Sequence, residues 1–145
     1  MQQVIESTIS KHVMLIDDEL SVRMSLAQSI ELAGFDVHCE ESAEQALEQL
    51  HAQWEGVIVS DISLPNMSGI ELLQKVQSID SEIPIIFITG HGDISMAVGA
   101  IQQGAYDFLE KPCAPDKLLD VIRRASEKRA LSLENQRLRN ELQTQ

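Results

Sequence analysis

Short apolar runs alternate with longer stretches of helical periodicity along this chain of 145 residues. Three runs, His12–Ile16, Val57–Val59 and Ile85–Ile88, are almost continuously apolar, as expected of strands that are covered on both faces. Phe35–Cys39 and Ala105–Leu109 instead alternate between apolar and polar positions, which favours strands at the edges of a sheet. The pattern predicts an α/β fold whose five parallel strands form a doubly wound sheet in the order 2-1-3-4-5.

The stretches between these strands carry helix-end signals, which are capping residues at some starts and glycines at some ends. The first carries an apolar stripe at helical spacing and closes before Gly34. Capping-box spacing predicts that the second and third helices start after Ser42 and Ser68. The fourth is expected between Asp93 and Gly104, so that a helix separates each pair of successive strands.

A fifth helix is expected to begin near Pro115 and to run to the end of the chain, because no helix breaker follows Asp116. The apolar residues that would dock its first turns on the sheet are Leu118, Leu119, Ile122 and Ala125. A second set repeats at heptad spacing on another face and consists of Leu131, Asn135, Leu138 and Leu142. A leucine seam broken by one Asn predicts a short parallel coiled coil, although two heptads would also fit a frayed amphipathic tail.

These boundaries divide the chain into a flexible N-terminus (1–10), a globular domain (11–127) and a helical coiled-coil linker (128–145). Apolar residues make up 43% of the sequence, which is enough for a packed core. No apolar run approaches the 18 or so residues of a membrane span, and the polar N-terminus does not fit a signal peptide. The two cysteines form no disulfide framework, so we expect a cytoplasmic protein without a membrane partner.

The formal net charge of −12 is distributed unevenly. The acidic excess lies within residues 1–122, which argues against direct binding of nucleic acid by the globular domain. Residues 123–145 are net basic. Their cations could contact a polyanion, but because they alternate with leucines they are interpreted as the solvated face of the last helix: Arg123, Arg124, Lys128, Arg129, Arg137 and Arg139.

Polar side chains stand where the predicted strands end. Asp17 and Asp18 follow the first strand, Asp61 the third, Thr89 the fourth and Lys111 the fifth. In a doubly wound sheet these carboxyl ends form the ligand-binding edge. Each residue alone has an ordinary explanation, such as capping of the first helix by an aspartate. Together they predict a site in which three close carboxylates require a cation, and oxygen ligands of this kind favour Mg²⁺.

The segments LIDDE, VSDISLPNMSG, FITGHGD and GAYDFLEKP resemble the receiver domains of bacterial response regulators across residues 11–127. The resemblance is strongest to the NtrC-like branch, and within it to the regulators of dicarboxylate transport. Such proteins carry an ATPase and a DNA-binding domain after the receiver and act on the enhancer-dependent sigma factor, sigma-54. This chain has no GxxxxGK[ST] phosphate loop, so we expect a receiver and its linker without the output domains.

The resemblance assigns the central role to Asp61, which would accept a phosphoryl group from a sensor histidine kinase. It implies that Mg²⁺ is bound directly by the carboxylates of Asp18 and Asp61 and by the backbone carbonyl of Ser63, with Asp17 acting indirectly. The protein would then be a signalling switch and not an enzyme, although it would promote its own phosphorylation and dephosphorylation.

The resemblance also implies a relay. Lys111 and Thr89 would contact phosphoryl oxygens, and Phe108 would turn into the space that the Thr89 side chain leaves. Tyr106 is the alternative aromatic, but its spacing from the lysine differs from the family pattern. The change would reach a homodimer that forms through the fourth helix, fifth strand, fifth helix and coiled coil. The family also has a cis bond before Pro112.

Three other functions are compatible with parts of the pattern. A hydrolase of the haloacid dehalogenase type needs a second aspartate two residues after the nucleophile, where this chain has Ser63. A degenerate receiver would lack site residues, and all are present here. A stand-alone receiver of the chemotaxis type would not need the long last helix. Repression relieved by phosphorylation and activation gained by it both stay open.

Overall fold

The computed structural model describes residues 11–143, so the expected flexible N-terminus (1–10) lies outside the described residues. Five parallel strands form one sheet in the order β2-β1-β3-β4-β5. Their bounds are His12–Ile16 (β1), Asp36–Glu40 (β2), Gly56–Asp61 (β3), Ile85–Thr89 (β4) and Asp107–Glu110 (β5). The predicted fold and strand order are confirmed, with the two alternating strands at the edges.

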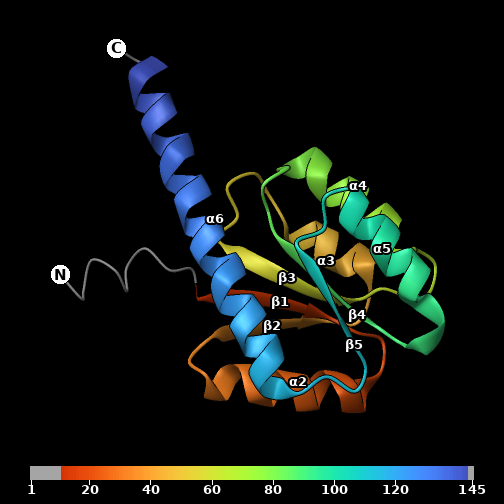
Figure 1. Cartoon of the computed structure of the whole chain (residues 1–145). Coiled ribbons are helices and arrows are strands. Elements are labelled where there is room, and N and C mark those ends of the chain that lie inside the picture. The colour runs from red at the N-terminus through yellow and green to blue at the C-terminus, as the bar shows by residue number, and fades with distance from the viewer. Residues whose placement is uncertain (1–10, 144–145) are drawn as a thin grey trace.

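Helices cover both faces of the sheet (Figure 1). They are α2 (Leu20–Leu32), α3 (Ala43–Gln49), α4 (Gly69–Ile79), α5 (Ile94–Gln102) and α6 (Pro115–Gln143), with a 3₁₀ turn η1 (His91–Asp93) before α5. Helices α2 and α6 pack on one apolar cluster, and α3, α4 and α5 pack on the other. No helix among residues 11–143 is both long and apolar enough to cross a membrane.

The helix ends follow the capping signals of the sequence. The side chains of Ser42 and Ser68 accept hydrogen bonds from the backbone N–H three residues later, each at 3.2 Å. Gly34 and Gly104 follow α2 and α5 with φ values of +97° and +112°, a conformation that disfavours a side chain. Asp93 precedes α5 but makes no side-chain capping bond.

The core lies on both sides of the central strands. Every residue of β3 and β4 is buried, in keeping with their continuous apolar runs. Burial on both faces leaves β3 and β4 no solvent-facing side. Their last residues, Asp61 and Thr89, stand at the edge of the sheet where the carboxyl ends of the strands meet.

One prediction about α6 is wrong. The sequence predicts Arg129 on a solvated face, yet the residue is fully buried. Its Nε donates to the backbone oxygen of Trp54 at 3.0 Å, and its Nη2 donates to Asp80 Oδ2 at 2.9 Å. The guanidinium is satisfied here because α6 crosses the loops that precede β3 and β4, where a carbonyl and a carboxylate replace water.

Helix α6 stays in contact with the domain beyond residue 127, where the linker was predicted to begin. Ser132 Oγ donates to Glu82 Oε2 at 2.6 Å, and Gln136 Nε2 donates to the same oxygen at 3.3 Å. The helix then extends away from the sheet (Figure 1). The predicted seam is solvent-exposed in this single chain, at Leu131 (67%), Leu138 (43%) and Leu142 (73%). The coiled coil itself stays a prediction.

Candidate functional site

Three carboxylates meet at the carboxyl ends of β1 and β3, which are neighbours in the sheet. Asp17 and Asp18 directly follow β1, and Asp61 is the last residue of β3. One oxygen from each lies within 4.8 Å of the other two. Asp17 is only 2% exposed and Asp61 9%, whereas Asp18 is exposed. The sequence placed these three residues at one edge, and the structure brings them together.

Asp17 is held by two contacts from the start of α2. Its Oδ1 accepts the backbone N–H of Glu19 at 2.9 Å, and its backbone oxygen accepts Arg23 Nη1 at 2.6 Å. Asp18 makes no capping bond to the helix, so the simple capping explanation does not hold for it. The sequence did not single out Arg23 as a residue that holds Asp17 in place. Its position in the first turns of the helix that follows the acidic pair is the signal that could have indicated this role.

The pKa of Asp17 is raised, first because the carboxyl is buried and also because Asp61 and Asp18 repel a further negative charge. The hydrogen bond from Glu19 and the charge of Lys111 offset part of this effect. Burial is thus the main cause of the raised pKa, and the charges of Asp61 and Asp18 add to it.

Lys111 partly neutralises this charge from the far side of β4. Its Nζ donates to Asp61 Oδ2 at 2.8 Å, with the lysine side chain 33% exposed and the aspartate side chain 11% exposed. Burial lowers the pKa of Lys111, but the hydrogen bond and negative charge of Asp61, together with Asp17, outweigh it, so the pKa is raised. The following peptide bond to Pro112 is cis.

The loop after β3 holds the second oxygen of Asp61. The backbone N–H of Ser63 donates to Asp61 Oδ1 at 3.0 Å. The N–H of Ile62 donates to the backbone oxygen of Ile88 in β4, and that of Gly69 returns to the oxygen of Ile62, both at 3.0 Å. The Asp61 carboxylate is thus oriented by one bond to each of its oxygens.

Thr89 and Phe108 lie on the face of the sheet that α3, α4 and α5 cover. Thr89 is fully buried at the end of β4, and its hydroxyl donates to the backbone oxygen of Gly90 at 3.2 Å. Phe108 pairs in register with Phe87, two residues before Thr89, and packs half-buried on the same core cluster. Tyr106 instead packs on the opposite cluster, with Lys128 Nζ 5.5 Å from its ring centre.

The donor set fits a magnesium ion. It offers carboxylate oxygens from Asp17, Asp18 and Asp61, of which Asp18 is exposed enough to leave room for water ligands. Mg²⁺ prefers one or two carboxylates and retains several waters. Burial and, to a smaller extent, the charges of Asp61 and Asp18 raise the pKa of Asp17, and a bound dication would offset both effects by stabilising the carboxylate form.

The sequence matches the family described as the response regulator receiver domain over residues 13–123. This chain belongs to that family. Receiver domains are signalling switches that bind Mg²⁺ at an acidic pocket, receive their signal from sensor histidine kinases and are often dimeric. Membership in this family decides against the hydrolase interpretation.

The chain is 50% identical over 127 residues to the C4-dicarboxylate transport transcriptional regulatory protein DctD of Rhizobium meliloti, and 49% identical to DctD of Pseudomonas aeruginosa. These alignments cover 88% of this receiver domain chain and 28% of each regulator. The chain therefore spans little more than a quarter of the length of these relatives. The expected resemblance to regulators of dicarboxylate transport is confirmed.

Solved structures of other receiver domains have the same fold. The receiver domain of NtrX from Brucella abortus is 34% identical, with a TM-score of 0.75 over 79% of this chain and 98% of that chain. The response regulator StyR is 38% identical, with a TM-score of 0.85 over 92% of this chain and 67% of that chain. The expected placement in the NtrC-like branch agrees with these findings.

Proposed function

We propose that this receiver domain accepts a phosphoryl group on Asp61 from the phosphohistidine of a sensor histidine kinase. The observation that carries the proposal is the set of contacts around Asp61, with Lys111 Nζ at 2.8 Å and the oxygens of Asp17 and Asp18 within 4.8 Å. An Asp61 carboxylate oxygen attacks phosphorus, the phosphorus–nitrogen bond breaks, and the imidazole leaves with that electron pair and takes up a proton. That proton comes from solvent, and the phosphoryl group remains on Asp61 as an acyl phosphate.

The chain's own residues position and neutralise the transferred group. Lys111 holds Asp61 in the attacking orientation and then pairs with a phosphoryl oxygen. Asp18 and Asp61 are the proposed direct ligands of Mg²⁺, with the backbone carbonyl of Ser63 as the third protein ligand and Asp17 acting through its neighbours. When bound, the ion offsets the negative charge that grows on the phosphoryl oxygens during transfer.

The relay begins at Thr89. Its hydroxyl now donates to its own neighbour, Gly90, so it is available to turn toward a phosphoryl oxygen on Asp61. That rotation would empty buried space on the face where Phe108 is only half-buried. Phe108 would then turn inward and alter the surface formed by α5, β5 and α6.

The proposed output is a change in a homodimer that controls a transcription activator. The relatives at about 50% identity are named transcriptional regulatory proteins and extend far beyond this receiver domain. By family resemblance, the added parts are a sigma-54-dependent ATPase and a DNA-binding domain. The dimer would form through α5, β5 and α6 and through the exposed seam of Leu131, Asn135, Leu138 and Leu142.

The test is phosphorylation with acetyl phosphate and Mg²⁺, followed by mass spectrometry of the intact chain. One phosphoryl group should be added, and Asp61→Asn should abolish the addition. Asp18→Asn should lose the labelling that depends on Mg²⁺, because the remaining carboxylates hold the ion poorly. The control Asp116→Asn, at an exposed position in α6, should be labelled like the parent. Equal labelling of Asp61→Asn would refute the assignment.

A further inference from the structure

A second group of metal-ligating side chains lies on the edge of the sheet formed by β1 and β2. His12 begins β1, and Asp36 and His38 lie in β2. The parallel register pairs His12 with Asp36, and Met14 with His38. Because side chains alternate between the two faces of a strand, all three residues project from the same face.

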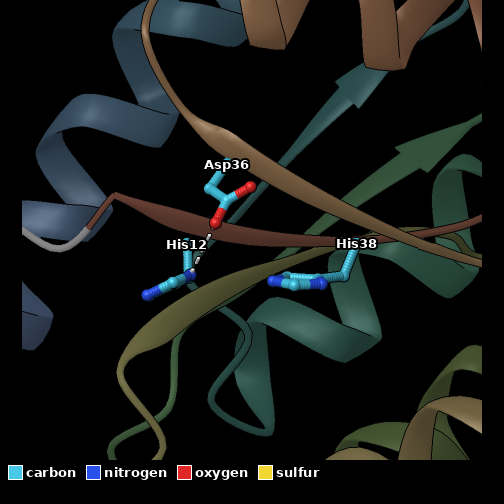
Figure 2. Close-up of side chains that lie close together, drawn as sticks. All are labelled: His12, Asp36 and His38. Carbon is cyan, nitrogen blue, oxygen red and sulfur yellow. Dashed lines mark ion pairs between the residues drawn. The ribbon is translucent and has the colours of Figure 1, made fainter.

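The three side chains converge (Figure 2). One ligand atom from each lies within 4.8 Å of the other two. His12 Nδ1 is 3.6 Å from Asp36 Oδ2, and the rings of His12 and His38 stack with their centres 5.8 Å apart at an angle of 30°. The ligand atoms of a tetrahedral zinc ion with bonds of about 2.0–2.1 Å stand roughly 3.4 Å apart. The His12–Asp36 pair, at 3.6 Å, is close to that separation. The ligand atom of His38 lies within 4.8 Å of both and would approach them by rotation of its side chain.

The cluster is open to solvent. Asp36 and His38 are exposed, and the His12 side chain is 43% exposed. An arriving ion therefore meets no packed side chains, and water can occupy its remaining coordination position. Two imidazoles and one carboxylate, with an open position, form a ligand set that zinc occupies in proteins.

This cluster is separate from the carboxylate site. His12 is the first residue of β1 and Asp17 follows its last, so about five residues, or roughly 16 Å of strand, lie between the two groups. The ligands also differ in kind, because imidazole nitrogen favours zinc and the neighbouring transition metals, while carboxylate oxygen favours Mg²⁺. Mg²⁺ at the carboxylate site is not expected to compete for the histidines.

We propose that His12, Asp36 and His38 form a binding site for a divalent transition-metal ion, and that this ion is Zn²⁺. The ion would bridge β1 to β2. Among the described residues, β2 has β1 as its one partner strand in the sheet, so a bridging ion would fasten an edge that otherwise depends on one ladder of hydrogen bonds. Zn²⁺ would stabilise the folded state because it binds the folded chain in preference to the unfolded chain.

The experiment is a calorimetric titration of the full, tag-free chain with ZnCl₂ in the presence of excess MgCl₂, which keeps the carboxylate site filled. One Zn²⁺ should bind per chain and raise the melting temperature, whereas MgCl₂ alone should not produce the histidine-dependent rise. His38→Asn should weaken Zn²⁺ binding by about tenfold or more, and Asp36→Asn should also weaken it. Titration with CoCl₂ should give visible absorption bands that both variants lose.

The matched control is His51→Asn, because His51 is an exposed histidine in the loop between α3 and β3. That variant should bind Zn²⁺ like the parent. Both His38→Asn and Asp36→Asn change exposed side chains, and circular dichroism establishes that each is folded. Unchanged Zn²⁺ affinity in both variants would overturn the proposal, as would loss of binding in Asp18→Asn alone. Absence of Zn²⁺ binding by the parent would reduce the cluster to a surface ion pair.

Discussion

The guanidinium of Arg129 and the carboxylate of Asp80 form an ion pair between α6 and the end of α4. Their atoms Nη2 and Oδ2 are 2.9 Å apart, and the side chains are 0% and 9% exposed. Arg129 also donates to the backbone oxygen of Trp54. One side chain thus joins α6 to the two loops that lead into β3 and β4.

Replacing Arg129 with methionine should destabilise the domain. The apolar part of the side chain is retained, but Asp80 is left as a largely buried charge without its partner. Removal of one member of a buried pair costs about 3–5 kcal/mol, so we expect the free energy of unfolding to fall by about 3 kcal/mol. Urea denaturation followed by circular dichroism measures this change.

Two controls on the same helix bracket this result. Arg124→Met breaks an exposed pair with Asp120 and should change stability by less than about 1 kcal/mol. Ser126→Ala removes a buried hydroxyl that has no hydrogen-bond partner among the described residues, so it should raise stability by about 1 kcal/mol. If Arg129→Met proves no more harmful than Arg124→Met, the ion pair does not anchor the helix.

The same pair predicts a pH dependence. Burial raises the pKa of Asp80, but hydrogen bonds from Arg129, Gln53 and Glu82 and the charge of Arg129 outweigh it, so the pKa is lowered from its ordinary value. The resulting stabilisation is fully present above the unfolded pKa of about 3.9 and is lost as the pH falls through the lower folded value. The stability difference between the parent and Asp80→Asn should therefore be constant near neutrality and shrink below about pH 4.

Urea titrations of both proteins at a series of pH values test this expectation. The comparison isolates Asp80, because every other carboxyl is common to the two proteins. A difference that widens on acidification would show that folding favours the protonated form of Asp80.

The relay predicts different effects for the two aromatic residues of the β5 region. Phe108→Ala should leave phosphorylation of Asp61 close to the parent yield, because the bonds that orient the Asp61 carboxylate come from Ser63 and Lys111. It should remove most of the change in association that phosphorylation produces. Tyr106→Ala should retain that change, since Tyr106 packs on the opposite core cluster beside Lys128. Mass spectrometry and sedimentation with and without acetyl phosphate measure the two effects, and uncoupling by Tyr106→Ala alone would reverse the assignment.

The dimer seam is best tested by polar substitution. Cutting the chain after Ala125 would also remove Arg129 and Ser132, so loss of the dimer could not be separated from loss of the fold. Leu131→Gln combined with Leu138→Gln changes only exposed side chains and should make the chain monomeric while the circular dichroism of the folded domain is retained. Leu32→Gln, at a position 81% exposed on α2, is the control and should leave the mass in solution unchanged.

Much of this molecule could be predicted from its sequence, because each signal is local. The continuous apolar strands set the centre of the sheet, and the residues after them necessarily share one edge, so Asp61 and Lys111 could be placed together. Arg129 could not be predicted in this way. Its neighbours in sequence are charged and leucine-rich, and its partners Asp80 and Trp54 come from two distant loops. A buried arginine differs from an exposed one only through such tertiary contacts.

The three attachments of α6, at Arg129, Ser132 and Gln136, also set the rotational phase of the helix about its own axis. An α-helix turns by about 100° per residue, so the azimuth at which Leu138 and Leu142 emerge is dictated by the domain. In a paired assembly, this phase fixes which flanks of the two domains oppose each other. One residue inserted after Gln136 would rotate the distal leucines away from Leu131 and leave the domain intact. The direction in which the predicted seam faces is therefore set in part by the Arg129 guanidinium. Its hydrogen-bond acceptor, the backbone oxygen of Trp54, lies 75 residues earlier in the sequence.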